Sequence, residues 1–188
     1  KDRLAGTKIQ GAILAPSRES WRPPEEDWVK VNVDGAYSII TTKSACGGLV
    51  RDSFGKFLKG FIYQIENGDA LSVEIWGCLL GLRMAWAMGC RKVWIETDST
   101  ECRDLVIQGA EHNHRDSDLL SQVRAMLDRD WLTKITYVPR TCNNAADFLA
   151  KTGLEGTQGY QEIYLPSDTL QGLISRDWIG CNIDLGIC

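Results

Sequence analysis

The sequence has no long hydrophobic run and no excess of positive charge. Its apolar stretches fall short of the roughly 20 residues that a membrane-spanning helix needs, and residues 1–19 have no apolar core followed by a cleavage site, as a signal peptide would. Lys and Arg number 21 against 25 Asp and Glu, which gives a formal net charge of −4. This balance argues against a basic arm or tail that binds nucleic acid by charge alone.

Disulfide and zinc signatures are also missing. The seven cysteines are an odd number and no pair forms Cys-x-x-Cys, so neither a disulfide framework nor a zinc knuckle is indicated. Several cysteines, such as Cys78, lie in apolar segments, which predicts buried free thiols in a reducing compartment and hence an intracellular protein of the nucleus or cytoplasm. The only histidines, His112 and His114, could pair on a metal, but no further ligand is near in sequence and we expect a solvated loop.

The length and composition indicate one domain of ordinary size with tails. Apolar residues make up 44% of the 188 residues and charged residues 24%, enough for a normal soluble core. We expect an N-terminal linker over residues 1–27, a domain over 28–153, and a polar C-terminal tail over 154–188. Because the chain begins at Lys1 rather than Met, we expect a trimmed or partial product.

Hydrophobic periodicity within residues 28–153 predicts an α/β fold. Strands, helices and turns are expected in the order β-β-β-α-β-α-α-β-α, and the helical crossovers imply that the first, fourth and fifth strands run parallel. The expected strands are 29–34, 47–51, 56–65, 91–97 and 131–138, and the expected helices are 72–88, 99–108, 116–129 and 143–151, the last capped by Asn143 and stopped by Gly153.

Two acidic residues follow parallel strands of this expected sheet. Asp34 lies near the end of the first strand, just before Gly35, and Asp98 ends the fourth strand. Ligands of open α/β sheets collect beyond the carboxyl ends of parallel strands. If the first and fourth strands are neighbours, Asp34 and Asp98 lie side by side at that edge.

Two further acids lie in the first turns of helices. Glu74 begins the long helix, and the small residues Gly77, Cys78 and Gly81 on one stripe allow that helix to lie close on the sheet. Asp147 begins the last helix, which follows the fifth strand and returns to the same edge. The four acids are therefore expected to converge.

Converging carboxylates repel one another unless a cation lies between them. Hard divalent cations prefer oxygen ligands, and two Mg²⁺ ions about 4 Å apart can activate a water and stabilise a leaving oxygen in phosphodiester cleavage. Each acid also has a structural interpretation: a turn at Asp34, helix-dipole stabilisation at Glu74 and Asp147, and an N-cap at Asp98. Taken together, in this order of strands and helices, the four acids favour a metal site.

Short motifs recur in a set order along the chain: residues 31–36 (VNVDGA), 47–52 (GGLVRD), Glu74 in its helix, 96–99 (ETDS), 138–140 (VPR), Asn143, and 146–147 (AD). In this order they resemble the ribonuclease H type 1 family. The resemblance is strongest to the plant ribonuclease H-like domains that occur alone and in non-LTR retrotransposon polyproteins. It runs from about residue 21 to 153, and residues 165–183 also look like that plant group.

The resemblance implies a ribonuclease H-like fold, with a five-stranded mixed sheet in the order 3-2-1-4-5 flanked by helices. It implies an endonuclease that hydrolyses the RNA strand of RNA–DNA hybrids with two Mg²⁺ ions, or Mn²⁺ in their place. By resemblance, the catalytic metal ligands are Asp34, Glu74, Asp98 and Asp147, and the substrate contacts are Ser99 and Asn143. The expected partner is an RNA–DNA hybrid rather than a membrane, and the expected state is a monomer or part of a larger polyprotein.

The sequence departs from the family at three places. Tyr137 stands where many members have a histidine that assists proton transfer or product release. Residues 69–73 (DALSV) replace a Thr/Asn/Gln-rich stretch that grips the DNA strand, and the basic insertion of some bacterial members is absent. These departures leave open a nucleic-acid-binding module of low or no activity. A transposase or 3′-5′ exonuclease of the same superfamily fits the three-strand opening less well.

Overall fold

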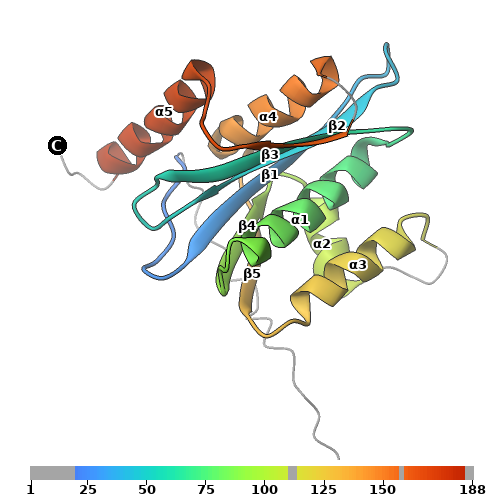
Figure 1. The fold of residues 1–188 in the computed structure, drawn as a ribbon, viewed down its shortest axis with the longest axis horizontal. Coiled ribbons are helices and arrows are strands. Elements are labelled where there is room, and N and C mark those ends of the chain that lie inside the picture. The colour runs from blue at the N-terminus through green and yellow to red at the C-terminus, as the bar shows by residue number, and fades with distance from the viewer. Residues whose placement is uncertain (1–19, 110–113, 157–158, 185–188) are drawn as a thin grey trace, which may run out of the picture.

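A computed structural model describes residues 20–109, 114–156 and 159–184, and these form a sheet with helices on both faces (Figure 1). The sheet has six strands in the order β5-β4-β1-β2-β3-β6. The strands are β1 (Val29–Tyr37), β2 (Ser44–Arg51), β3 (Phe57–Ile65), β4 (Lys92–Thr97), β5 (Leu132–Tyr137) and β6 (Gly159–Ile163). The helices are α1 (Ala70–Ala87), α2 (Thr100–Gln108), α3 (Ser117–Leu127), α4 (Asn144–Glu155) and α5 (Asp168–Asp184), with a short 3-10 turn over Arg140–Cys142.

The strand directions confirm the expected ribonuclease H-like topology. β1 pairs antiparallel with β2 and parallel with β4, and β5 runs parallel to β4. The order 3-2-1-4-5 is therefore present, and the structure adds β6 antiparallel to β3 at the outer edge. The sequence of β6, GYQEI, has little apolar alternation because most of its residues are exposed. That is why periodicity did not reveal it.

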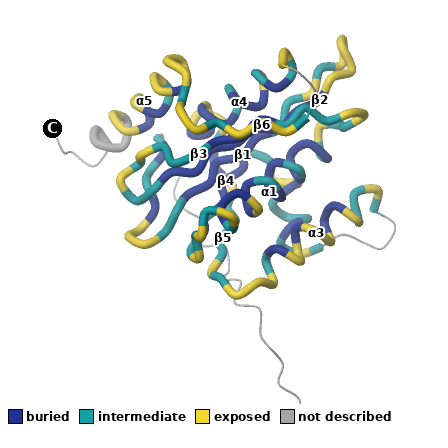
Figure 2. Tube along the Cα trace, in the orientation of Figure 1, coloured by how far each residue is buried: buried dark blue, intermediate teal, exposed yellow. Residues whose placement is uncertain are grey.

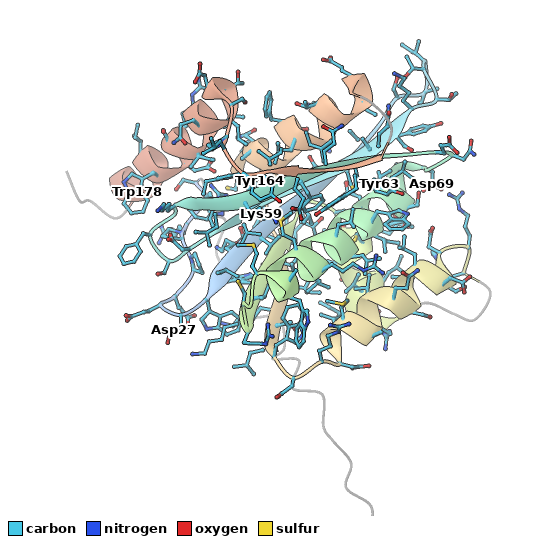
Figure 3. The ribbon with its side chains drawn as sticks, in the orientation of Figure 1. Asp27, Lys59, Tyr63, Asp69, Tyr164 and Trp178 are labelled. Atoms are coloured by element: carbon cyan, nitrogen blue, oxygen red, sulfur yellow. The ribbon has the colours of Figure 1, made fainter. Side chains whose placement is uncertain are left out.

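Side chains of β3 hold β6 in place. The Lys59 ammonium lies 2.7 Å from the Glu162 carboxylate and 4.7 Å from the centre of the Tyr164 ring (Figure 3). Tyr160 packs against Phe61 and Tyr63 from across the strand pair. The segment after residue 153, expected to be a tail, therefore contributes to the sheet.

The two faces of the sheet are covered by different helices. α1, α2 and α3 lie on one face, where Val31 and Val33 of β1 join the larger core, and α4 and α5 lie on the other (Figures 1 and 2). By length and composition α1 could cross a membrane, but 61% of it is buried in the protein, as expected of a core helix. The small-residue stripe predicted for α1 is confirmed, since a Cβ on Gly81 would lie 2.9 Å from Val31 Cγ1.

Several element boundaries differ from those expected. α1 begins at Ala70 rather than Ser72, because the Asp69 carboxylate accepts hydrogen bonds from the amides of Leu71 and Ser72. α4 does not stop at Gly153 but continues to Glu155. Gly153 is needed for close packing instead, because a Cβ there would lie 2.7 Å from Ala45 Cβ.

Both ends of the described chain pack on the core. Trp21, within the expected linker, is only 3% exposed, and its indole donates to the Asn32 amide oxygen at 2.9 Å. Leu170 and Ile174 of α5 are buried with Leu149 of α4 in a second core cluster. The folded unit therefore extends beyond residues 28–153 on both sides.

Among the described residues no disulfide joins the cysteines, as expected. Cys46, Cys78, Cys102 and Cys142 are buried and Cys90 is partly buried. The side chain of Cys181 and the whole of Cys188 lie outside the described residues.

The predicted solvated loop of the two histidines falls largely outside the described residues. His112 is among residues 110–113, which the structure does not describe. His114 is described, and its Nδ1 accepts a hydrogen bond from the Asp116 amide at 3.1 Å.

Candidate metal centre

Three carboxylates from three elements meet at the carboxyl ends of β1 and β4. Asp34 lies on β1, Glu74 in α1 and Asp98 directly after β4, and one oxygen of each lies within 4.8 Å of the others. We call these three residues the acidic cluster. In the part of the chain that the structure describes, they are the one group of acidic, Cys or His residues so placed.

Strand register and one glycine explain this convergence. β1 and β4 pair in parallel with Val33 opposite Thr97, so Asp34 and Asp98 come next at the same sheet edge. Gly35 allows α1 to approach, because a Cβ there would lie 2.5 Å from Val73 Cγ2 and 2.9 Å from the Glu74 backbone nitrogen. The first turn of α1 is thereby brought against the strand that bears Asp34.

Burial and mutual repulsion oppose ionisation of the cluster. Burial, then the charges of Asp98 and Asp147, raise the pKa of Asp34 to about 7. Burial, then the charges of Asp34 and Asp98, raise the pKa of Glu74 to about 10. Asp34 is 1% exposed and Glu74 9%. Ionisation of these buried carboxyl groups is unfavourable unless a cation neutralises them. Carboxylate oxygens are the ligands that a hard divalent cation such as Mg²⁺ prefers.

The fourth expected acid, Asp147, lies in the first turn of α4 but outside the acidic cluster. Its Oδ2 accepts a hydrogen bond from the Lys151 ammonium at 2.8 Å. Its charge contributes to raising the pKa of Asp34, so its carboxylate lies near that residue. The structure thus brings three of the four acids into mutual contact distance and leaves the fourth nearby.

Arg140 lies in the turn between β5 and α4 and belongs to the motif VPR, which by itself predicts no role for it. Its Nε lies 3.0 Å from Asp98 Oδ2. The Arg140 side chain is 79% exposed, whereas that of Asp98 is 3% exposed. Hydrogen bonding to Asp98 and the charges of Asp98 and Asp34 raise the pKa of Arg140. The available signal was a basic residue in the loop that precedes Asp147.

The two expected substrate contacts have different environments. Ser99 is partly exposed beside the cluster and caps α2, where its Oγ accepts from the Cys102 amide at 3.1 Å. Asn143 is 1% exposed. Its amide group donates to the Val33 carbonyl at 2.9 Å, and its Oδ1 accepts from Asn32 at 3.1 Å.

These contacts correct the expected role of Asn143. It occupies the N-cap position of α4, but its side chain makes no capping hydrogen bond, so the expectation of a side-chain cap was wrong. The side chain is buried and already hydrogen-bonded within the protein, and its contact with a nucleic acid stays a prediction.

Tyr137 ends β5 opposite Thr97 of β4 and is 42% exposed. It is therefore not a core aromatic of β5. Its place at the carboxyl end of β5 brings it to the sheet edge that bears Asp34 and Asp98.

Comparisons with known proteins agree with this architecture. The family model "Reverse transcriptase-like" matches residues 32–153. The Arabidopsis thaliana protein named "Putative ribonuclease H protein At1g65750" is 32% identical over 160 residues, which cover 85% of this chain and 26% of that protein. This chain thus spans about a quarter of the length of that relative.

Solved ribonuclease H structures share the fold. RNase H1 of the archaeon Halobacterium salinarum is 22% identical with a TM-score of 0.63, over 68% of this chain and 98% of the other. LC11-RNase H1, solved in complex with an RNA/DNA hybrid, is 14% identical with a TM-score of 0.61, over 68% of this chain and 96% of the other.

Proposed function

This chain belongs to the reverse transcriptase-like family of ribonuclease H-like domains, and from that premise we propose that it is a metal-dependent endonuclease. Its proposed substrate is the RNA strand of an RNA–DNA hybrid. The single observation that supports this best is the acidic cluster, in which Asp34, Glu74 and Asp98 lie within 4.8 Å of one another. A structural role does not require three buried carboxylates to face one another, because their mutual repulsion opposes folding.

In this proposal, Asp34, Glu74 and Asp98 hold divalent metal, and Asp147 completes the site from α4. Two Mg²⁺ ions bound there, or Mn²⁺ in their place, would supply an activated water and a stabilised leaving oxygen for phosphodiester hydrolysis. Gly35 donates its amide to Asp34 Oδ1 at 2.9 Å, and Thr97 approaches Glu74 with its hydroxyl at 3.5 Å. These contacts orient the carboxylates before any ligand binds.

We assign the substrate phosphate to Arg140. Its guanidinium is exposed, lies beside the buried cluster, and hydrogen-bonds Asp98 through Nε. Arginine donates from several N–H groups in a planar fork that suits phosphate oxygens. Ser99, next to Asp98 and partly exposed, is the proposed neighbour of the RNA 2′-hydroxyl, the group that distinguishes RNA from DNA.

A specific observation favours a second candidate, a domain that binds hybrids and cleaves them slowly or not at all. Tyr137 occupies the edge position where many family members have a histidine, and a tyrosine with an ordinary pKa near ~10 is a poor proton shuttle at neutral pH. The two candidates differ in turnover and agree on substrate binding.

A cleavage assay tests the proposal. A labelled RNA–DNA hybrid is incubated with the protein and Mg²⁺, beside single-stranded RNA, duplex RNA and an EDTA control. We expect cleavage of the hybrid alone, dependent on metal. The variant Asp34→Asn should abolish it, whereas Glu101→Gln, which removes an exposed carboxylate at the start of α2, should retain it. Tight hybrid binding without cleavage by the original chain would support the binding domain instead.

A further inference from the structure

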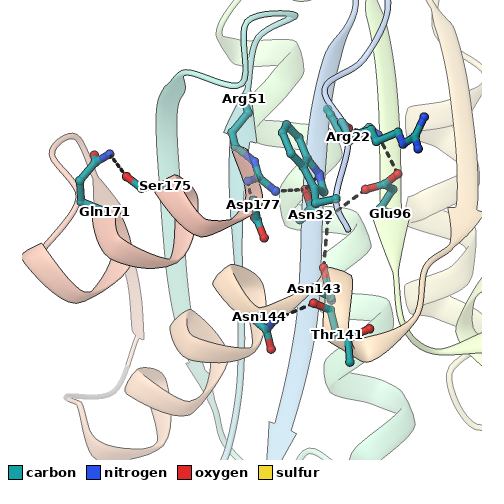
Figure 4. Close-up of polar contacts among 12 residues, drawn as sticks. Arg22, Asn32, Arg51, Glu96, Thr141, Asn143, Asn144, Gln171, Ser175 and Asp177 are labelled. Atoms are coloured by element: carbon teal, nitrogen blue, oxygen red, sulfur yellow. Dashed lines mark hydrogen bonds and ion pairs between the residues drawn. The ribbon is translucent and has the colours of Figure 1, made fainter. Parts of the chain in front are cut away.

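A buried polar network lies on the α4 and α5 side of the sheet (Figure 4). Its members are Lys30, Asn32, Arg51, Glu96, Asn143 and Asp177, none of them more than 8% exposed. Lys30 and Arg51 balance Glu96 and Asp177 in charge. Polar groups this deeply buried are costly unless they are fully paired, so the arrangement of each depends on the others.

Asn32 of β1 is at the centre of this network. Its Nδ2 donates to Glu96 Oε2 and to Asn143 Oδ1, each at 3.1 Å. Its Oδ1 accepts from Arg51 at 2.8 Å and from the Trp21 indole at 2.9 Å. One amide side chain thus joins β1, β2, β4, the start of α4 and the N-terminal segment.

Asn32 and two of its hydrogen-bonded partners, Glu96 and Asn143, each stand close in sequence to an acid of the candidate site. Asn32 precedes Asp34 by two residues on β1, and Glu96 precedes Asp98 by two residues at the end of β4. Asn143 lies one turn before Asp147 and also bonds the Val33 carbonyl. Hydrogen bonds among Asn32, Glu96 and Asn143 therefore hold together the three elements that bear the acids.

The network is closed by a residue of the C-terminal helix. Asp177 of α5 lies 2.6 Å from Arg51, and Arg51 is otherwise bonded to Asn32 and stacked 3.5 Å from the Trp21 ring centre. Asp177 falls outside residues 32–153, the range that the family model matches. Helix α5, which lies outside the matched range, thus contacts Arg51 and through it Asn32.

We propose that Asp177 is a positioning residue for the acidic site: its ion pair with Arg51 holds Asn32 in the orientation that aligns β1, β4 and the start of α4. This inference rests on the proposed function for its consequence in cleavage. Metal binding and the position of Asp34 in metal-free protein test it without a cleavage assay. If it holds, α5 contributes to the acidic site and is not a separate tail.

Loss of Asp177 would act through a competing partner. The charge of Glu96, the other carboxylate of the network, also acts on the pKa of Arg51. Glu96 is held by Lys30 at 2.8 Å and by Asn32. A buried guanidinium without its partner is strongly unfavourable, so Arg51 would turn toward Glu96 and displace Asn32. The positions of Asp34 on β1 and Asp98 after β4 would then be less well fixed relative to each other.

The test compares Asp177→Ala with Ile174→Ala in the full chain. Ile174 is on the same helix and buried in the second core cluster, and no polar contact links it to the network. A double variant, Arg51→Met with Asp177→Leu, removes the pair without leaving a buried charge, which guards against simple unfolding. Mg²⁺ affinity is measured by calorimetry, and the Gly35 amide resonance, which reports its hydrogen bond to Asp34, is recorded in metal-free protein.

We expect both variants of Asp177 to shift the Gly35 resonance and to weaken Mg²⁺ binding about 10-fold, the lower end of the range for losing a residue that orients metal ligands. Ile174→Ala should lower the melting temperature but change neither readout. An unchanged resonance and affinity in the Asp177 variants, or equal changes in Ile174→Ala, would overturn the inference.

The outcome is separable from that of the proposed function. An original chain that binds Mg²⁺ but does not cleave hybrid would refute the nuclease and leave the inference standing if the Asp177 variants bind Mg²⁺ more weakly. An original chain that binds no Mg²⁺ would leave the Gly35 resonance in metal-free protein to decide: a shift in the Asp177 variants supports the inference, and no shift refutes it.

Discussion

The Nε atom of Arg140 lies 3.0 Å from Oδ2 of Asp98, so an exposed arginine stands directly over a buried carboxylate. Without metal, this contact offsets part of the negative charge of the acidic cluster. In the proposed enzyme the same guanidinium faces the substrate. The pair links the electrostatics of the acidic cluster to the proposed recognition of phosphate.

Replacement of Arg140 by Gln should slow hybrid cleavage. A hydrogen bond to a charged group contributes about 1.5–3 kcal/mol, which corresponds to a roughly 10- to 150-fold loss of kcat/KM. Steady-state kinetics on hybrid measure the change. Arg83→Gln is the matched control, because Arg83 is also an exposed arginine but hydrogen-bonds Gln122 of α3, away from the acids of the site. Equal losses in the two variants would contradict a specific role for Arg140.

Replacement of Asp98 by Asn should remove cleavage and leave folding intact or slightly improved, because one repelling charge is lost. Mg²⁺ should raise the melting temperature of the original chain, by linkage worth about 2.7 kcal/mol at one hundred times Kd. The rise should be much smaller in the variant. Thermal melts with and without Mg²⁺ measure both, and equal rises would count against a shared ion site.

The metal-free protein should lose stability as the pH rises. The folded-state pKa values of Asp34, about 7, and Glu74, about 10, lie above their ordinary values. Their favourable contribution is complete below the ordinary carboxyl pKa near ~4 and is lost as the pH passes through the raised values. Melts in EDTA at several pH values should show falling melting temperatures.

The variant Glu74→Gln is the control for this pH effect, because it removes the group with the higher pKa. Its melting temperature should fall less steeply between neutral and alkaline pH. A flat or rising curve for the original chain would contradict the electrostatic account of the cluster.

Replacement of Tyr137 by His should raise single-turnover cleavage about 10-fold or more, because an imidazole with a pKa near ~6.5 is suited to proton transfer at neutral pH. The melting temperature should change little, since Tyr137 is 42% exposed at the end of β5. Tyr160→His is the control at a similarly exposed tyrosine, 43%, on the opposite edge strand. If neither protein cleaves and both bind hybrid tightly, the binding domain is the better assignment.

Replacement of Leu170 by Ala should destabilise the whole domain by about 2–5 kcal/mol, the range for a large-to-small change in a core. Leu170 is 1% exposed and packs in the cluster that joins α4 to α5. Chemical denaturation of the full chain measures the effect in one transition. A loss confined to a separate early transition would indicate that α5 is an independent tail.

The sequence by itself determined the order of the elements from β1 to α4 along the chain and the place of each acid in them, and the family resemblance supplied the strand order. Alternating apolar residues in β1 and the crossover helices before β4 and β5 are local patterns, and parallel neighbours place Asp34 and Asp98 at one edge by geometry alone. Gly77 and Gly81 predicted the close approach of α1 that brings Glu74 to them. These features depend on periodicity and on residue size, which any short window of sequence displays.

Only the tertiary structure decided what lies around those acids. Asn143 was expected to cap the last helix, but its side chain pairs with Asn32, 111 residues away, in the interior. Arg51 and Asp177 are 126 residues apart, and β6 and α5 came from a segment expected to be a tail. Such pairings depend on which elements pack together and on which buried charges must find partners, and no local periodicity encodes that choice.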